Sequence, residues 1–181
     1  MLFYSSAAEV PVRNRAAEAL IDFANSRGPT GMASIFFCNS GSEANENALK
    51  IAAKLTGRFR FVAFEGGWHG RGTLPLSVTD DSKISTPYTP FLAPCTRLPW
   101  NDEAAVAICD FNDIAAVILE PIQSMSGIRA ATPAFLKKLR AKTSAAGAFL
   151  IFDEIQTGIG RLGVPFAGTK YDVQPDLITS A

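Results

Sequence analysis

Apolar residues follow two kinds of pattern along this chain. Short and almost continuous apolar runs predict buried strands at residues 34–39, 60–64, 114–119, 148–152 and 177–180. Wider patterns with helical spacing predict helices over residues 11–26, 42–55, 102–110 and 133–146. Buried strands that alternate with helices are typical of a mostly parallel sheet covered on both faces, so the predicted fold class is α/β.

Capping residues support three of the helices. Pro11 suits the first turn of the first helix, which Gly28 can end. Ser40 and Glu43 have capping-box spacing at the start of the second helix. Its predicted inner face consists of Ala44, Ala48, Ile51, Ala52 and Leu55. The fourth helix is predicted to begin after a cap at Thr132 and to stop at Gly147.

One long stretch lacks such periodicity. Residues 65–100 are rich in Gly, Pro, Ser and Thr, which predicts a loop. A loop of this length inside a compact domain is usually functional. Polar residues also follow the predicted strands directly, and ligands of such sheets bind at the carboxyl ends of the strands. We therefore expect a site at that edge of the sheet.

Composition excludes several classes of protein. The chain has 181 residues, 48% of them hydrophobic and 19% charged, so a substantial core is expected. The 17 basic and 17 acidic residues balance, which argues against nucleic acid or an anionic membrane as a partner. No apolar run approaches the ~20 residues of a membrane span, and no secretion signal is visible.

Cysteine and histidine usage indicates a reducing compartment and argues against a metal site. Cys38, Cys95 and Cys109 are odd in number and lack metal-ligand spacing, as expected of reduced cysteines in a cytoplasmic protein. His69 is the only histidine, so no cluster of histidines can bind a metal. We expect no metal site.

The sequence Ser40-Gly41-Ser42 joins an apolar run to the start of a helix. A helix N-terminus aims free backbone N–H groups at one point and attracts an anion, most often a phosphate. Gly41 lets the backbone approach a ligand closely, and the two serine hydroxyls can donate hydrogen bonds. An ordinary helix cap explains the same residues, and the turn alone does not decide between the two readings.

Three further residues could carry chemistry. Asp153 follows an apolar strand, where a partly buried carboxylate needs a cationic partner or caps the next turn. Trp68 lies among glycines, where it is either an exposed aromatic side chain that can stack on a flat ring or a core residue at a loop corner. Arg71 offers a planar fork for a carboxylate, or is a surface arginine without a ligand.

Several long motifs, in order and with similar spacing, resemble those of the class III aminotransferases, which are pyridoxal-phosphate enzymes of fold type I. They are Asn39-Ser40-Gly41-Ser42-Glu43-Ala44-Asn45-Glu46, Phe64-Glu65-Gly66-Gly67-Trp68-His69-Gly70-Arg71, Leu119-Glu120-Pro121-Ile122-Gln123, Leu150-Ile151-Phe152-Asp153-Glu154-Ile155-Gln156-Thr157-Gly158, Gly160-Arg161 and Gln174-Pro175-Asp176. The resemblance covers nearly the whole chain. Its implied fold is the large, cofactor-binding domain of a fold type I enzyme, in part.

The resemblance implies a role for each matching residue. Ser40, Gly41 and Ser42 would lie at the cofactor phosphate, and Trp68, His69 and Ile155 would lie around its ring. Asp153 would pair with the ring nitrogen, and Gln156 would lie near the phenolic oxygen. On the substrate side, Glu120 would shape the site and Arg71 would bind a carboxylate. The implied partners are a small-molecule amino donor, a 2-oxo acid and a second subunit of a homodimer.

Two departures qualify the resemblance. The family's Schiff-base lysine would be the residue after Ala181, so we expect this chain to be an inactive fragment that lacks the lysine, an N-terminal segment and the C-terminal small domain. In addition, Met125 stands where ornithine-type members have Glu. We expect an aminotransferase that acts on an ω-amino acid such as acetylornithine. The alternatives are a glutamate-semialdehyde-aminomutase-like or amine–pyruvate-type enzyme, and a catalytically dead binding or scaffold domain.

Overall fold

The computed structural model describes residues 9–27 and 30–181. Its centre is a five-stranded sheet in the order β2-β1-β3-β6-β7, and every neighbouring pair is parallel. The strands are β1 (Arg60–Phe64), β2 (Cys95–Leu98), β3 (Ile114–Leu119), β6 (Phe149–Asp153) and β7 (Leu177–Thr179). The parallel sheet confirms the predicted α/β class.

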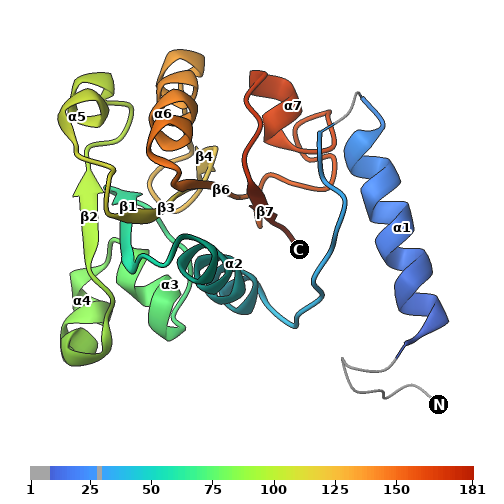
Figure 1. Ribbon diagram of the computed structural model, residues 1–181, viewed down its shortest axis with the longest axis horizontal. Coiled ribbons are helices and arrows are strands. Elements are labelled where there is room, and N and C mark those ends of the chain that lie inside the picture. Colours follow the sequence, from blue (N-terminus) through green and yellow to red (C-terminus); the bar gives the residue numbers. More distant parts are fainter. Residues whose placement is uncertain (1–8, 28–29) are drawn as a thin grey trace.

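Helices cover both faces of this sheet (Figure 1). One layer holds α2 (Gly41–Thr56) and α3 (Thr73–Val78), and the other holds α5 (Glu103–Ile108) and α6 (Pro133–Ala146). The remaining elements are α1 (Pro11–Asn25), α4 (Ser82–Ser85), the 3-10 helix η1 (Thr86–Phe91), α7 (Ala167–Tyr171) and a short antiparallel hairpin of β4 (Ile122–Gln123) and β5 (Arg129–Ala130). In Figure 1, α1 lies at the side of the molecule, beyond β7 and α7.

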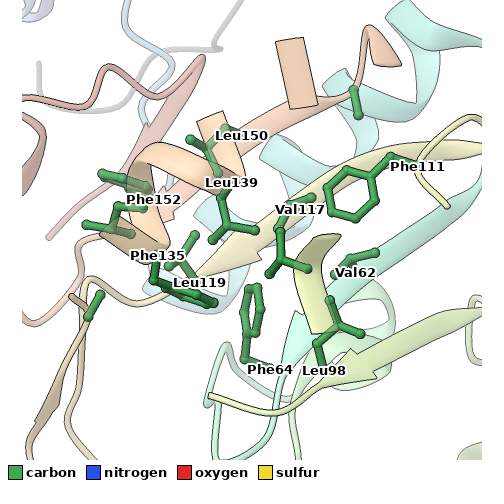
Figure 2. Close-up of a cluster of buried hydrophobic side chains, with 14 of the residues drawn as sticks. Val62, Phe64, Leu98, Phe111, Val117, Leu119, Phe135, Leu139, Leu150 and Phe152 are labelled. Atoms are coloured by element: carbon green, nitrogen blue, oxygen red, sulfur yellow. The ribbon is translucent and has the colours of Figure 1, made fainter. Parts of the chain in front are cut away.

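The core has two halves, one on each face of the sheet. All six residues of β3 are buried, and their side chains alternate between the two faces. Val117 and Leu119 pack with Phe135 of α6 in one cluster, which Figure 2 shows. Ala116 and Ile118 pack with α2 in the other. Burial on both faces explains why this strand is a continuous apolar run.

The predicted caps are confirmed. The Ser40 hydroxyl accepts the Glu43 N–H at 3.2 Å, and the Glu43 carboxylate accepts the Asn39 N–H at 2.8 Å. Thr132 caps α6 by accepting the Phe135 N–H at 3.2 Å. Gly147 ends α6 with a φ of +64°, which glycine adopts without the strain that a side chain brings.

The prediction of a buried strand at residues 34–39 is wrong. The segment is extended but has no strand partner among the described residues, and Ile35, Phe36 and Phe37 are exposed. The predicted inner face of α2 is wrong in part, since Ile51 and Leu55 are exposed. Its buried face consists instead of Asn45, Ala48, Leu49, Ala52 and Ala53.

The predicted loop over residues 65–100 is also wrong, because α3, α4, η1 and β2 lie within it. β2 is an edge strand in which only Leu98 is buried, so its apolar signal is weak. The short α7 was not predicted, and β6 extends one residue further than expected, to Asp153. Gly28, the predicted end of the first helix, lies outside the described residues.

Candidate cofactor site

The ends of several strands and the start of α2 surround one cavity of about 150 Å³. Segments after β1, β3 and β6 meet the first turn of α2 there, at the carboxyl edge of the parallel strands, as the fold predicts. The lining residues are Gly41, Ser42, Asn45, Trp68, His69, Gly70, Glu120, Ser124, Met125, Asp153, Ile155 and Gln156.

The structure brings together eight of the ten residues predicted for the site, namely Gly41, Ser42, Trp68, His69, Glu120, Asp153, Ile155 and Gln156. Ser40 is exposed and caps α2, and it does not line the cavity. Arg71 lines a second cavity instead. The sequence motifs thus converge in space, except at these two positions.

Asp153 lies at the centre of the site, 4% exposed, and its two oxygens have different surroundings. Oδ2 accepts the Asn45 Nδ2–H at 2.7 Å and lies 2.8 Å from His69 Nδ1. Oδ1 has only weaker contacts, since it accepts the Ile155 N–H at 3.2 Å and has a long contact, 3.5 Å, with the Thr179 hydroxyl. One oxygen is firmly held, and the other keeps room for a further donor.

His69 is a buried support for this carboxylate. Its backbone N–H donates to the Thr79 hydroxyl at 2.9 Å, and its backbone carbonyl accepts from Asn45 at 2.8 Å. The ring is held through Nδ1 by Asp153, while Nε2 is buried without a hydrogen-bond partner. The imidazole therefore helps to fix the orientation of the Asp153 carboxylate.

Glu120 closes the cavity on another side and is also buried. One carboxylate oxygen accepts the Trp68 N–H at 2.9 Å, and the other accepts the Ser124 N–H at 3.2 Å. Burial raises the pKa of Glu120 above its ordinary value, although these hydrogen bonds act in the opposite direction. Glu120 thereby links the loop that carries Trp68 to the segment that follows β3.

The start of α2 and the loop that follows β1 are tightly joined. The Ser42 hydroxyl accepts the Gly72 N–H at 2.9 Å, and the Glu46 carboxylate accepts the Leu74 N–H at 3.0 Å. Gly70 has a φ of +116°, and a Cβ there would lie 2.6 Å from Ser42 Oγ. A Cβ on Gly41 would lie 3.0 Å from the Ile155 side chain. Both glycines permit close approaches that a side chain would block.

Glu154 follows Asp153 but belongs to different surroundings. It is fully buried, and both of its carboxylate oxygens accept the Ala167 N–H at the start of α7, at 2.9 and 2.8 Å. The Thr157 hydroxyl lies 3.2 Å from one of them. Burial raises the pKa of Glu154 to about 7. Through these hydrogen bonds, Glu154 holds the loop that carries Ile155 and Gln156 in place.

The second cavity, of about 540 Å³, has Arg71 at its wall and a mainly apolar lining. The other lining residues are Thr73, Leu76, Ile84, Tyr88, Phe91 and Leu92. Arg71 is exposed and has no ion pair with any described residue. Its guanidinium is thus free to take an anionic group.

The residues of the first cavity fit pyridoxal phosphate. The open acceptor on Asp153 suits a protonated ring nitrogen, and the first turn of α2 suits a phosphate. Trp68 and Ile155 offer apolar surface for a flat ring. No lysine lines the cavity, within the part of the chain that the structure describes.

Two other features are absent from the described residues, namely a cluster of metal ligands and a membrane-spanning helix. Over residues 9–27 and 30–181, no three His, Cys, Asp or Glu side chains gather in a way that could hold a metal ion. None of the helices in these same ranges has the length and apolar character needed to cross a membrane. Cys38, Cys95 and Cys109 form no disulfide in this structure.

Sequence reasoning missed four lining residues, which are Asn45, Gly70, Ser124 and Met125. Asn45 carried a usable signal, since it is polar, lies one turn after Gly41 and shares the buried face of α2 with Ala48 and Leu49. Met125 was noted only as a departure from the Glu of ornithine-type members. Ser124 carried no signal, because these two residues line the cavity as a result of the β4–β5 hairpin, which is too short to predict.

Comparisons with known proteins agree with the geometry. The family model "Aminotransferase class-III" matches residues 11–181. An acetylornithine aminotransferase from Halalkalibacterium halodurans is 40% identical over 172 residues, which are 95% of this chain and 43% of that protein. A [LysW]-aminoadipate semialdehyde/glutamate semialdehyde transaminase from Sulfolobus acidocaldarius is 40% identical over 97% of this chain and 44% of its own length.

A solved structure extends the likeness to three dimensions. The taurine:2-oxoglutarate aminotransferase from Bifidobacterium kashiwanohense, in complex with PLP and glutamate, matches all of this chain and 45% of its own, with a TM-score of 0.87 and 26% identity. This chain thus spans less than half the length of these relatives. Because the family model matches nearly the entire length of this chain, the chain belongs to the class III aminotransferases.

Proposed function

We propose that this chain is the cofactor-binding part of a longer pyridoxal-phosphate-dependent aminotransferase. The enzyme transfers an amino group from an ω-amino acid such as acetylornithine to a 2-oxo acid. The family membership supports the reaction class, and the acetylornithine aminotransferases among the relatives support the donor. The share of each relative that the chain spans, 43% in one case, supports a longer protein.

The observation that carries the proposal is the unequal environment of the Asp153 carboxylate. Asn45 and His69 hold Oδ2 of this cavity-lining residue, while Oδ1 has only a 3.2 Å hydrogen bond from the Ile155 N–H and a 3.5 Å contact with the Thr179 hydroxyl. A charge-assisted hydrogen bond from a protonated ring nitrogen would complete this acceptor. Such a bond is the feature by which a protein tunes this cofactor.

When bound, pyridoxal phosphate supplies an electron sink that makes the proton on the carbon beside the substrate nitrogen acidic. Asp153 keeps the ring nitrogen protonated. Gly41 and Ser42 bind the phosphate through the backbone N–H groups of the first turn of α2, which have no helical acceptor. Trp68 and Ile155 would orient the ring and exclude water from its faces, and Gln156 would interact with the phenolic oxygen.

The substrate side of the site involves Glu120 and Arg71. Glu120 orients Trp68 and lines the cavity, and Arg71 binds a carboxylate with two parallel hydrogen bonds. A second candidate is an enzyme for simple amines, of the amine–pyruvate type. It is favoured by Met125, an apolar residue on the cavity wall, and by the position of Arg71 in another cavity.

The proposal includes two properties of the longer protein. It is a homodimer, in which the partner subunit contributes to the phosphate site, as the family resemblance implies. It is located in the cytoplasm, which the three free thiols support, since disulfides are rare in reducing compartments.

The test is single-turnover amino transfer by the longer protein, followed through the absorbance of the bound cofactor. Asp153→Asn should slow transfer from every donor by roughly 10–100-fold, because it removes one charge-assisted hydrogen bond. Cofactor affinity should fall only by the ~10-fold that this single contact contributes, since the phosphate contacts are intact. An unchanged rate in Asp153→Asn would overturn the proposed function.

The same assay separates the two donor classes. Arg71→Ala should slow transfer from acetylornithine at least ~10-fold, since it removes a bidentate carboxylate contact, and should leave a carboxylate-free amine almost unaffected. Arg27→Ala removes an exposed arginine that lines neither cavity and serves as the control. Equal effects of Arg71→Ala on both donors would favour the simple-amine enzyme.

A further inference from the structure

Asn45 is an interior residue of α2 whose side chain is satisfied at every polar atom. It is 1% exposed. Its amide nitrogen donates to Asp153 Oδ2 at 2.7 Å and to the His69 carbonyl at 2.8 Å. Its amide oxygen accepts the Thr179 hydroxyl at 2.7 Å. A reversed amide would bring its oxygen against two acceptors, so these contacts permit only one orientation.

Thr179 completes this arrangement from the neighbouring strand β7. A threonine hydroxyl has a single proton to donate. The short contact to Asn45, at 2.7 Å, uses that proton, and the distance to Asp153 Oδ1 is 3.5 Å. The hydroxyl therefore does not compete for Oδ1, although it lies beside it.

We propose that Asn45, oriented by Thr179, is a positioning residue that anchors one oxygen of Asp153 and leaves the other for the ring nitrogen of the cofactor. The inference rests on the proposed function, because the ring nitrogen belongs to pyridoxal phosphate. Without the Asn45 amide, Oδ2 keeps only His69, and the Thr179 hydroxyl is released to donate to Oδ1. Oδ1, the oxygen that would accept the hydrogen bond of the ring nitrogen, then accepts a hydrogen bond from the protein instead.

The test measures how much the ring nitrogen contributes to binding in the longer protein. The two ligands are pyridoxal phosphate and an analogue with a CH group in place of the ring nitrogen. The readout is the ratio of their dissociation constants, which isolates the contact of Asp153 with the ring. A role in folding alone would weaken both ligands by the same factor and leave the ratio unchanged.

We expect the native protein to prefer pyridoxal phosphate at least ~10-fold, as for one charge-assisted hydrogen bond. Asn45→Leu should remove most of this preference. Thr179→Val keeps the size of the side chain and should reduce the preference about 3-fold, because the amide loses the partner that orients it. Thr179→Ser keeps the hydroxyl and should match the native ratio.

Asn47→Leu is the matched control. Asn47 lies on the same helix, and its amide donates to the Glu43 carbonyl at 2.9 Å rather than toward the cavity. Its ratio should equal that of the native protein. The inference is overturned if Asn45→Leu and Thr179→Val both keep the native ratio, or if Asn45→Leu weakens both ligands equally. Equal affinities for the two ligands in the native protein would instead refute the pairing of Asp153 with the ring, and with it the proposed function.

Discussion

Two adjacent regions of this molecule differ sharply in how their conformation is fixed. Around the cavity, segments far apart in the sequence are joined by hydrogen bonds between buried polar groups, such as the contacts of Asp153 with Asn45 and His69. The segment at residues 31–38 leads directly into that cavity edge, yet its large apolar side chains Ile35, Phe36 and Phe37 are exposed. Among the described residues, its hydrogen bonds are few and local: the Asn25 side chain donates to the Met32 carbonyl at 3.2 Å, the Met32 N–H to the Thr30 hydroxyl at 3.3 Å, and the Cys38 thiol to the Ser40 carbonyl at 3.8 Å.

The difference shows what an apolar pattern can and cannot predict. An apolar run indicates side chains that favour burial, and it does not identify the surface that buries them. β3 finds a strand on each side and a helix layer on each face. The segment at residues 31–38 has no neighbouring strand and no covering helix layer within the described chain. The cavity edge, in contrast, is specified by polar contacts, which secondary-structure propensities do not encode.

The largest expected effect comes from adding one methyl group to the cavity edge. In Gly70→Ala, the new Cβ would lie 2.6 Å from Ser42 Oγ and 3.0 Å from Ser42 Cα, at a φ of +116°. Overpacking and backbone strain cost about 1–3 kcal/mol each, so the free energy of unfolding should fall by roughly 2–6 kcal/mol. Urea unfolding of the 181-residue chain gives this value.

Gly31→Ala is the matched variant in the extended segment. Gly31 has a φ of +74°, but no atom lies within 4 Å of the position that a Cβ would occupy. Only the backbone strain remains, about 1–2 kcal/mol. Similar losses in the two variants would show that the Gly70 loop is not pressed against α2, and the contrast between the regions would disappear.

A pH dependence is expected from the cavity edge, through Glu154. Burial raises its pKa to about 7 in the folded chain, from 4.5 for an ordinary glutamate. The folded state therefore binds the proton more tightly than the unfolded state. The resulting stabilisation is fully present below pH 4.5 and is lost as the pH rises through about 7. The difference is on the order of 3 kcal/mol, at about 1.4 kcal/mol for each tenfold change in acidity.

Glu154→Gln isolates this effect, because the amide resembles the protonated carboxyl and does not titrate. The free energies of unfolding of both proteins are measured by urea at several values from pH 4.5 to 8. The native chain should lose stability relative to the variant as the pH rises, while Glu120 titrates in both and cancels. Parallel curves would mean that Glu154 is hydrated or paired in solution.

The sequence predicts the frame of this molecule well and its polar details poorly. β1, β3, α2 and α6 follow from periodicity and caps, because each buries a stripe or a whole strand within the chain. β2 and α7 were missed, since both are short and β2 lies at the edge of the sheet.

The candidate site likewise has residues that the sequence predicts and residues that it does not. Family motifs identified eight of its lining residues. They did not place Arg71, because a side chain two residues beyond His69 can point away from the cavity that His69 lines. Nor did they assign Asn45, whose amide oxygen accepts the hydroxyl of Thr179, a residue 134 positions away. Contacts of that kind exist only once the strands are assembled.

The smallest expected effect lies in the extended segment. Phe36 is 65% exposed, so Phe36→Ser removes little buried apolar surface. The free energy of unfolding of the dilute 181-residue chain should change by less than about 0.5 kcal/mol, as is usual for exposed positions. For comparison, a buried phenylalanine such as Phe64, 1% exposed, should cost about 3–5 kcal/mol when replaced by Ala.

A concentration series makes this last prediction decisive. Exposed apolar side chains on an extended, unpaired segment favour association, so the native chain should form larger species at high concentration and Phe36→Ser should form fewer. At low concentration the two should have the same stability. A loss of about 2 kcal/mol or more that persists on dilution would mean that Phe36 is buried within the single chain. The segment would then resemble the core rather than contrast with it, and an apolar run would again be enough to predict its burial.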